Sequence, residues 1–146
     1  MQRGAFAADA GALIELVYGT PMGEALRDAM LGEDADVVTH EIAITELRYV
    51  LCRIMGKEES RARVEKLLAS GYIFVEDITG LVEAAADYKC ERAISLPDCF
   101  TLSLGKNRSL KVLFATRERE LAKEMDRRPF DVEIQFLEDF RLTRLE

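Results

Sequence analysis

Four carboxylates that lie far apart along the chain are the residues whose types and positions could support chemistry. Asp9 directly follows the first expected strand, and Thr116 and Glu118 follow a later one. Asp98 comes at the start of an expected helix, and Glu46 lies one to two turns into another. In open parallel sheets, ligands bind outside the carboxyl ends of the strands. We therefore expect these acids to meet at that edge of the sheet.

Four acids gathered at one edge would repel one another. Like charges held close together raise each other's pKa and destabilise a fold unless a cation offsets them. Mg²⁺ or Mn²⁺ would do so, because both prefer hard oxygen ligands and can share the phosphate oxygens of a substrate. Each acid alone has a simpler explanation as a helix cap, a helix-dipole partner or a solvated side chain. The metal site is therefore predicted from the set of four and not from any one member.

The elements that must position these acids are short apolar runs alternating with longer amphipathic patterns. Strands are expected over residues 5–8, 36–38, 72–75, 111–115 and 132–136. Helices are expected over residues 12–17, 21–31, 41–55, 58–69, 79–94, 97–104, 117–125 and 137–140, with Thr39 as the N-cap of the third. Strands that are apolar throughout are typical of a parallel sheet covered on both faces. We expect one domain over residues 1–146, an α/β fold with three layers (α/β/α) and a parallel sheet of about four or five strands.

Composition limits the class of protein. The 146 residues are 49% hydrophobic and 32% charged, which is ordinary for a globular domain. No apolar run approaches the roughly 20 residues that a bilayer-spanning helix needs. The first eight residues lack the apolar core of a signal peptide, so we expect a cytoplasmic protein without membrane association. The net charge of −7 excludes a uniformly basic nucleic-acid-binding surface but leaves a local site open.

Other catalytic motifs are missing from the sequence. His40-Glu41 could begin a zinc-protease helix, but there is no second histidine, and we expect His40 at a helix start. No glycine-rich phosphate loop occurs. The three cysteines form no Cys-x-x-Cys pair, which favours reduced thiols over disulfides or a zinc site.

Four segments together resemble the PIN domain family, and in particular its VapC-like toxins. Residues 6–16, which include Asp9, are similar to the family's opening strand and helix. Residues 45–51, with Glu46, resemble its second acidic block, and residues 96–104, with Asp98, its third. Residues 112–121 resemble the strand that ends in Thr-x-Asp in the family. Order and spacing match from Phe6 to about Phe140. Two positions depart from the pattern: Ala10-Gly11 replaces the usual Thr or Ser after the first Asp, and Glu118 replaces the fourth Asp.

The resemblance implies a Mg²⁺- or Mn²⁺-dependent endoribonuclease that hydrolyses RNA. Asp9 and Asp98 would be the principal metal ligands, Glu46 and Glu118 would complete the shell, and Thr116 would orient an acidic neighbour. The metal would lower the pKa of a bound water and stabilise charge developing on the phosphate. Five basic residues could hold RNA phosphates: Lys106, Arg108, Lys111, Arg117 and Arg119. Many small members of the family are toxins of toxin–antitoxin pairs, so the resemblance also implies a possible antitoxin protein and a homodimer formed through helices of the first half.

Two alternatives remain open at this point. A receiver-type signalling domain also gathers acids around Mg²⁺, with an aspartate after the third strand as the phosphate acceptor, and Asp77 could be offered for that role. A catalytically silent PIN-like module that only binds another protein is the second alternative, and the departures at Ala10-Gly11 and Glu118 keep it open.

Overall fold

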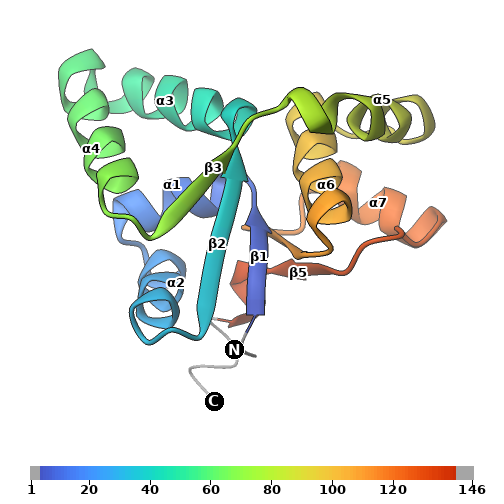
Figure 1. Cartoon of the computed structure of the whole chain (residues 1–146), viewed down its shortest axis with the longest axis horizontal. Coiled ribbons are helices and arrows are strands. Elements are labelled where there is room, and N and C mark those ends of the chain that lie inside the picture. Colours follow the sequence, from blue (N-terminus) through green and yellow to red (C-terminus); the bar gives the residue numbers. More distant parts are fainter. Residues whose placement is uncertain (1–3, 141–146) are drawn as a thin grey trace.

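A parallel sheet of five strands forms the centre of the structure, a computed structural model that describes residues 4–140 (Figure 1). The strands lie in the order β3-β2-β1-β4-β5. Their bounds are β1 Gly4–Ala8, β2 Ala35–His40, β3 Ile73–Glu76, β4 Lys111–Phe114 and β5 Ile134–Phe136. Every neighbouring pair is parallel, and β1 is the central strand. The predicted α/β class with a parallel sheet is confirmed.

Helices cover both faces of this sheet. One face is covered by α1 Ala10–Tyr18, α2 Pro21–Leu31, α3 Glu41–Met55 and α4 Lys57–Ala69. The other is covered by the short helix η1 Thr79–Leu81, α5 Val82–Glu91, α6 Leu96–Arg108 and α7 Arg119–Arg127 (Figure 1). A further helical turn begins at Leu137 and reaches Phe140, the last described residue. Helices on two faces of one sheet give the three layers expected from the sequence. No helix among residues 4–140 is long and apolar enough to cross a bilayer.

Side chains of the central strands point alternately into two separate cores. Phe6 belongs to the core under α1–α4, whereas Ala7 belongs to the core under α5–α7. In β4 the same alternation places Leu113 in the first core and its neighbours Val112 and Phe114 in the second. Because both faces are buried, these strands contain apolar residues at successive positions and not at alternate ones.

The N-cap of α3 is His40, so the prediction of Thr39 is wrong. The strand before it runs two residues further than expected, through both of these residues. The Thr39 hydroxyl donates to the carbonyl of Ala8 in the neighbouring strand, at 2.9 Å, and cannot cap a helix. His40 Nδ1 instead accepts a hydrogen bond from the backbone N–H of Ala43 at 3.1 Å. A contact between strands therefore overrides the local preference for a threonine cap.

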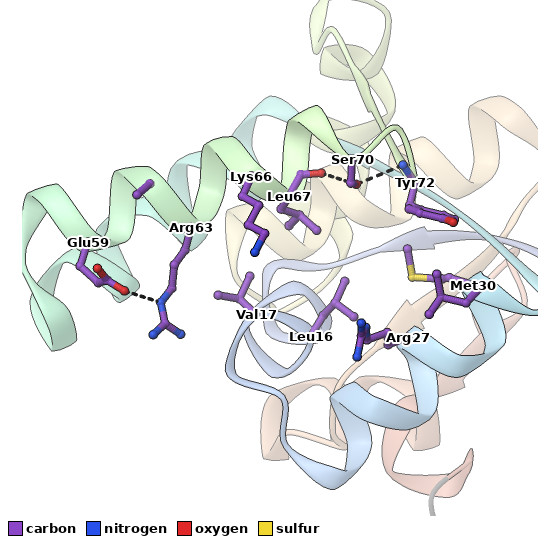
Figure 2. A pocket seen from close by; sticks show the side chains of 12 residues that line it. Leu16, Val17, Arg27, Met30, Glu59, Arg63, Lys66, Leu67, Ser70 and Tyr72 are labelled. Carbon is purple, nitrogen blue, oxygen red and sulfur yellow. Dashed lines mark hydrogen bonds and ion pairs between the residues drawn. The ribbon is translucent and has the colours of Figure 1, made fainter.

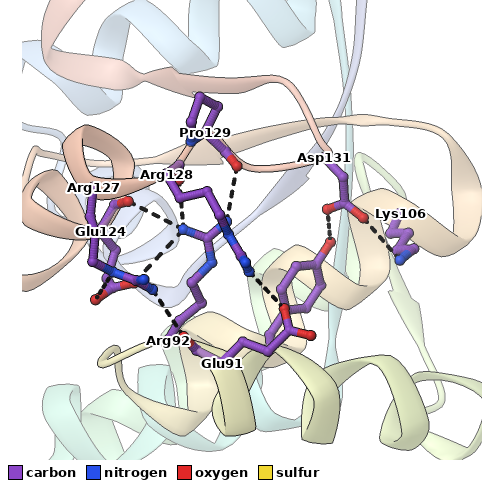
Figure 3. Close-up of polar contacts among 9 residues, drawn as sticks. Glu91, Arg92, Lys106, Glu124, Arg127, Arg128, Pro129 and Asp131 are labelled. Atoms are coloured by element: carbon purple, nitrogen blue, oxygen red, sulfur yellow. Dashed lines mark hydrogen bonds and ion pairs between the residues drawn. The ribbon is translucent and has the colours of Figure 1, made fainter.

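The helix expected over residues 79–94 is shorter in the structure, because Arg92 leaves the helical conformation. Its buried guanidinium donates to the carbonyls of Arg128, Pro129 and Glu124 at 2.6, 2.9 and 3.2 Å (Figure 3). The same group lies 3.9 Å from the ring centre of Phe130. A cation is favourable at the carboxyl end of a helix, here α7, whose last carbonyls would otherwise lack partners. Arg92 thus joins the ends of α5 and α7 on the second face.

Candidate functional site

Asp9 lies at the carboxyl end of the central strand and caps α1. Its backbone N–H donates to Leu113 O at 3.1 Å, and its Oδ1 accepts from the N–H of Ala12 at 2.8 Å. The capping function considered from the sequence is therefore real. It uses one carboxylate oxygen, however, and Oδ2 makes no hydrogen bond within the described part of the chain. Asp9 is half-buried, with one oxygen left for a further partner.

The pKa of Asp9 is raised to about 8, mainly because burial disfavours the charged form. The hydrogen bond from Ala12 opposes this shift. Three further carboxylates add to it by charge repulsion: Asp98, Glu46 and Glu118. Acids from three other segments of the chain therefore act electrostatically on Asp9.

Burial and charge repulsion also raise the pKa values of Asp98 and Glu46. Asp98 lies in the first turn of α6, where its N–H donates to the Ser95 hydroxyl at 3.3 Å. Burial, and then the charge of Glu118, raise the pKa of Asp98 to about 6. Glu46 lies in the second turn of α3, and burial followed by repulsion from Glu118 raises its pKa too. Both carboxylates are half-buried, so their charges are partly screened from solvent.

Glu118 occupies the N-cap position of α7 without capping it. Its side chain makes no cap hydrogen bond, and its backbone N–H donates to Thr116 O at 3.0 Å. The carboxylate is exposed and is therefore available to a ligand. Only the backbone carbonyl of Thr116 is engaged in this contact, so the expected orienting role of its hydroxyl stays a prediction.

Arg117, between these two residues, fixes their loop to the helical turn at residues 137–140. Its guanidinium forms two hydrogen bonds to the Asp139 carboxylate, at 2.7 and 2.5 Å, and one to Glu138 at 3.1 Å. It also lies 4.3 Å from the ring centre of Phe136. Arg117 was expected to contact RNA, but its position indicates a structural role in holding the segment that contains Glu118.

The donor chemistry of the four acids fits a hard divalent cation, since all the donors are carboxylate oxygens. Within residues 4–140, however, no three acidic, histidine or cysteine side chains are arranged so that they could hold one metal ion as they stand. Coordination would require the carboxylates to rotate toward a common point. The four acids are thus suitable ligands that repel one another, and their joint coordination of a single metal ion stays a prediction.

Gly11 lies directly beside Asp9, a position that could not be assigned from the sequence alone. A Cβ at this position would lie 3.2 Å from Asp9 Oδ2 and 3.1 Å from the Cβ of Ala115. A side chain would therefore crowd the carboxylate oxygen that makes no hydrogen bond. Glycine keeps the space beside Asp9 open.

Most of the basic residues expected to hold RNA are paired within the chain. Lys106 lies 2.9 Å from Asp131, and Arg108 lies 2.5 Å from Glu76. Lys111 is 3.9 Å from Glu133, and Arg117 is paired as described. Arg119 is exposed and forms no ion pair with any other described residue. An acidic neighbour for each cation could not be identified from sequence spacing alone.

The topology excludes the receiver-type alternative. Receiver domains have the strand order 2-1-3-4-5, whereas the order here is 3-2-1-4-5. Asp77, the proposed acceptor, is exposed, and its Oδ1 accepts from the backbone N–H of Thr79 at 2.7 Å. It is not among the charges that shift the pKa of Asp9.

A large groove of about 700 Å³ lies between α1, α2 and α4, and none of the four acids lines it (Figure 2). Its floor is apolar, and its edge contains three cations against one carboxylate, Glu59. The lining side chains are Leu16, Val17, Arg27, Met30, Leu31, Glu59, Ala62, Arg63, Lys66, Leu67, Ser70 and Tyr72. We call it the α1–α2–α4 groove.

Comparisons with known proteins agree with this architecture. A family model described as PIN domain matches residues 7–127. The toxin VapC20 of Mycobacterium tuberculosis, described as cleaving the sarcin-ricin loop, has a TM-score of 0.63 at 17% identity, covering 82% of this chain and 93% of that one. The structure of VapBC-1 from nontypeable Haemophilus influenzae has a TM-score of 0.62 at 15% identity, covering 92% of this chain and 98% of that one. The structure of FitAcB from Neisseria gonorrhoeae has a TM-score of 0.60 at 18% identity, covering 91% of this chain and 97% of that one. No curated protein sequence matches the chain. At these identities the structural likeness concerns the fold.

Proposed function

The chain belongs to the PIN domain family, and we propose that it is a Mg²⁺- or Mn²⁺-dependent endoribonuclease that hydrolyses RNA phosphodiester bonds. The observation that supports this most is the pKa of Asp9, raised to about 8 with contributions from three other acids. Repulsion of this kind destabilises the folded chain unless a cation offsets it. We propose that the protein acts in the cytoplasm.

Each acid has a proposed role in holding the cation. Asp9 would bind it through Oδ2 while Oδ1 keeps its bond to Ala12, and Asp98 would be the second principal ligand. Glu46 and Glu118 would complete the shell directly or through water. A bound metal ion would activate water and stabilise charge on the phosphate. Because ligating carboxylates must be ionised, binding would release the protons that the raised pKa values of Asp9 and Asp98 retain.

Cleavage of RNA by the purified chain tests this proposal. We expect cleavage with Mg²⁺ or Mn²⁺ and none in excess EDTA. Asp77→Asn is a suitable control, since it removes the same charge from an exposed aspartate outside the cluster. The proposal fails if RNA stays intact and calorimetry detects no binding of Mn²⁺, or if cleavage persists in EDTA.

We further propose that the α1–α2–α4 groove binds a helix of an antitoxin-type partner protein. Solved structures with this fold include VapBC-1 and FitAB bound to a DNA fragment. The chain has a net charge of −7, yet Arg27, Arg63 and Lys66 surround an apolar floor at this groove. An amphipathic helix with acidic residues beside its apolar face would be complementary to both features.

Charge reversal at the edge of the groove should weaken this association. Lys66→Glu is expected to reduce affinity about tenfold, mainly by slowing association, because edge charges steer encounter. The probe is the protein encoded by a short open reading frame next to this gene, measured by surface plasmon resonance. Lys57→Glu is the matched control, because Lys57 is an exposed lysine of the same helix that does not line the groove. Equal loss in both variants, or no binding by the unaltered chain, would refute the groove assignment.

The homodimer stays a prediction. Tyr49 and Ile54 on α3 are large apolar side chains with 47% and 61% exposure. Their place on a helix of the first half is compatible with a second copy of the chain.

A further inference from the structure

Two buried polar residues, Thr39 and His40, end the strand β2 beside the acidic cluster. Neither residue exposes any surface. The Thr39 hydroxyl donates to Ala8 O, the carbonyl that directly precedes Asp9. Buried polar side chains must find hydrogen-bond partners, and an incompletely satisfied network is costly. The partner of Thr39 directly precedes one acid of the proposed site, and the partners of His40 lie on the helices that contain two others.

The imidazole of His40 connects two helices. Its Nδ1 accepts from the N–H of Ala43 at 3.1 Å, in the first turn of α3, one turn before Glu46. Its Nε2 lies 2.9 Å from the hydroxyl of Thr101 in α6. In a neutral imidazole one nitrogen accepts and the other donates, so Nε2 bears the proton and donates to Thr101. Burial lowers the pKa of His40 to about 4, which keeps the ring neutral at pH 7.

The hydroxyl of Thr101 continues the connection to Asp98. It donates to Pro97 O at 3.2 Å, and this carbonyl belongs to the peptide group that links Pro97 to Asp98. Thr101 is buried, whereas Pro97 is half-buried. A continuous series of hydrogen bonds therefore runs from the first turn of α3 to the peptide group at Asp98.

We propose that His40 is a positioning residue that fixes, through Thr101, the location of Asp98 relative to Glu46 and so assists binding of the divalent cation. The inference rests on the proposed function, because it assigns a role to that metal site. A Ser or Thr cap would satisfy Ala43 equally well but is too short to reach the other helix. The imidazole spans that gap, and its ring packs 6.0 Å from the ring of Phe100.

The test compares Mn²⁺ affinities at a temperature well below unfolding. Thr101→Val removes the hydroxyl and keeps the shape, and we expect about tenfold weaker binding of Mn²⁺, as for other changes outside a metal's direct ligands. Thr101→Ser restores a hydroxyl and should recover most of the affinity. Ser103→Ala is the matched control: it removes a buried hydroxyl of the same helix, which donates to Leu81 O at 2.7 Å. This control should lower the melting temperature and leave Mn²⁺ affinity unchanged.

A second variant breaks the hydrogen bond between His40 and Thr101 at His40. His40→Asn retains an oxygen that can cap α3 but cannot reach Thr101. It should weaken Mn²⁺ binding as much as Thr101→Val, and the double variant should be no weaker than either single one.

Three outcomes would overturn the inference. If the losses of Mn²⁺ affinity in the two single variants add up in the double variant, His40 and Thr101 act independently. If Mn²⁺ affinity is unchanged in both variants, the positioning role is refuted and the proposed function is unaffected. A chain that binds no Mn²⁺ even when unaltered would overturn the proposed function and this inference together.

Discussion

Replacing Asp9 with asparagine should severely reduce metal-dependent RNA cleavage while leaving the fold at least as stable as before. A bound metal ion contributes several kcal/mol of transition-state stabilisation, and each 1.36 kcal/mol is tenfold in rate. We therefore expect the cleavage rate to fall about 10³-fold in Asp9→Asn. Single-turnover cleavage of a labelled RNA in saturating Mn²⁺ measures this directly.

The stability of the same variant distinguishes a metal ligand from a structural cap. An asparagine side chain can still accept the hydrogen bond from Ala12, so α1 keeps its cap. The variant also removes a charge that burial and three neighbouring acids disfavour. Its melting temperature in EDTA should thus equal or exceed that of the unaltered chain at pH 8. A variant that loses both activity and stability would indicate that Asp9 acts only as a cap.

Asp98→Asn provides an independent comparison. It should cause a similar loss of cleavage, whereas Asp77→Asn should cause none, since Asp77 lies outside the cluster. Retained cleavage in Asp98→Asn would remove this residue from the proposed ligands.

The sheet and its layers could be predicted from sequence because they depend on local patterns. Residues 112–114 are apolar enough to be recognised as a buried strand, and the position of Glu118 shortly after it follows directly. The same logic placed Asp9 at the carboxyl end of the first strand. The expectation that the acids converge at one sheet edge follows from parallel topology, so it could be made from the sequence, and it stays a prediction.

Features that depend on contacts between distant segments were not accessible. The choice between Thr39 and His40 as the cap of α3 depends on the carbonyl of Ala8, 31 positions away. The structural role of Arg117 likewise depends on acids 21 and 22 positions further on. Local propensity describes what a residue can do, and only the tertiary structure decides which partner it meets.

The two departures from the family pattern affect the site differently. Ala10-Gly11 lacks the hydroxyl that the family usually has after the first Asp. Gly11, however, leaves open space beside Asp9 Oδ2, so a ligand can reach that oxygen. Glu118 is exposed and makes no cap bond, and its longer side chain still acts electrostatically on Asp9 and Asp98. These observations favour a site that binds metal over a silent module, and measured Mn²⁺ binding would decide between them.

Stability without metal should decrease as the pH rises. The folded-state pKa of Asp9 is about 8 and that of Asp98 about 6, both above the ordinary aspartate value of 3.8. Between pH 3.8 and the folded pKa of each residue, the folded chain retains a proton that the unfolded chain has lost. Stability contributed by these protons is present at low pH and is lost as the pH rises through the folded pKa. His40 has the opposite dependence: between its folded pKa of about 4 and the ordinary value of 6.5 the unfolded chain binds a proton that the folded chain does not, so stability rises with pH there.

The interval from pH 7 to 9 contains the folded pKa of Asp9, and His40 is largely neutral there in both states. Burial raises the pKa of the Cys99 thiol to about 11, so Cys99 also contributes near pH 9. We expect Asp9 alone to lower the free energy of unfolding in EDTA by about 1 kcal/mol over this interval. Subtracting the same measurement on Asp9→Asn removes contributions from groups elsewhere in the chain. Mn²⁺ at about 100 times its dissociation constant should add about 2.7 kcal/mol at pH 8, and it should add little to Asp9→Asn. Equal pH dependence in the two chains would show that Asp9 does not retain its proton, and equal stabilisation by Mn²⁺ would show that the ion binds elsewhere.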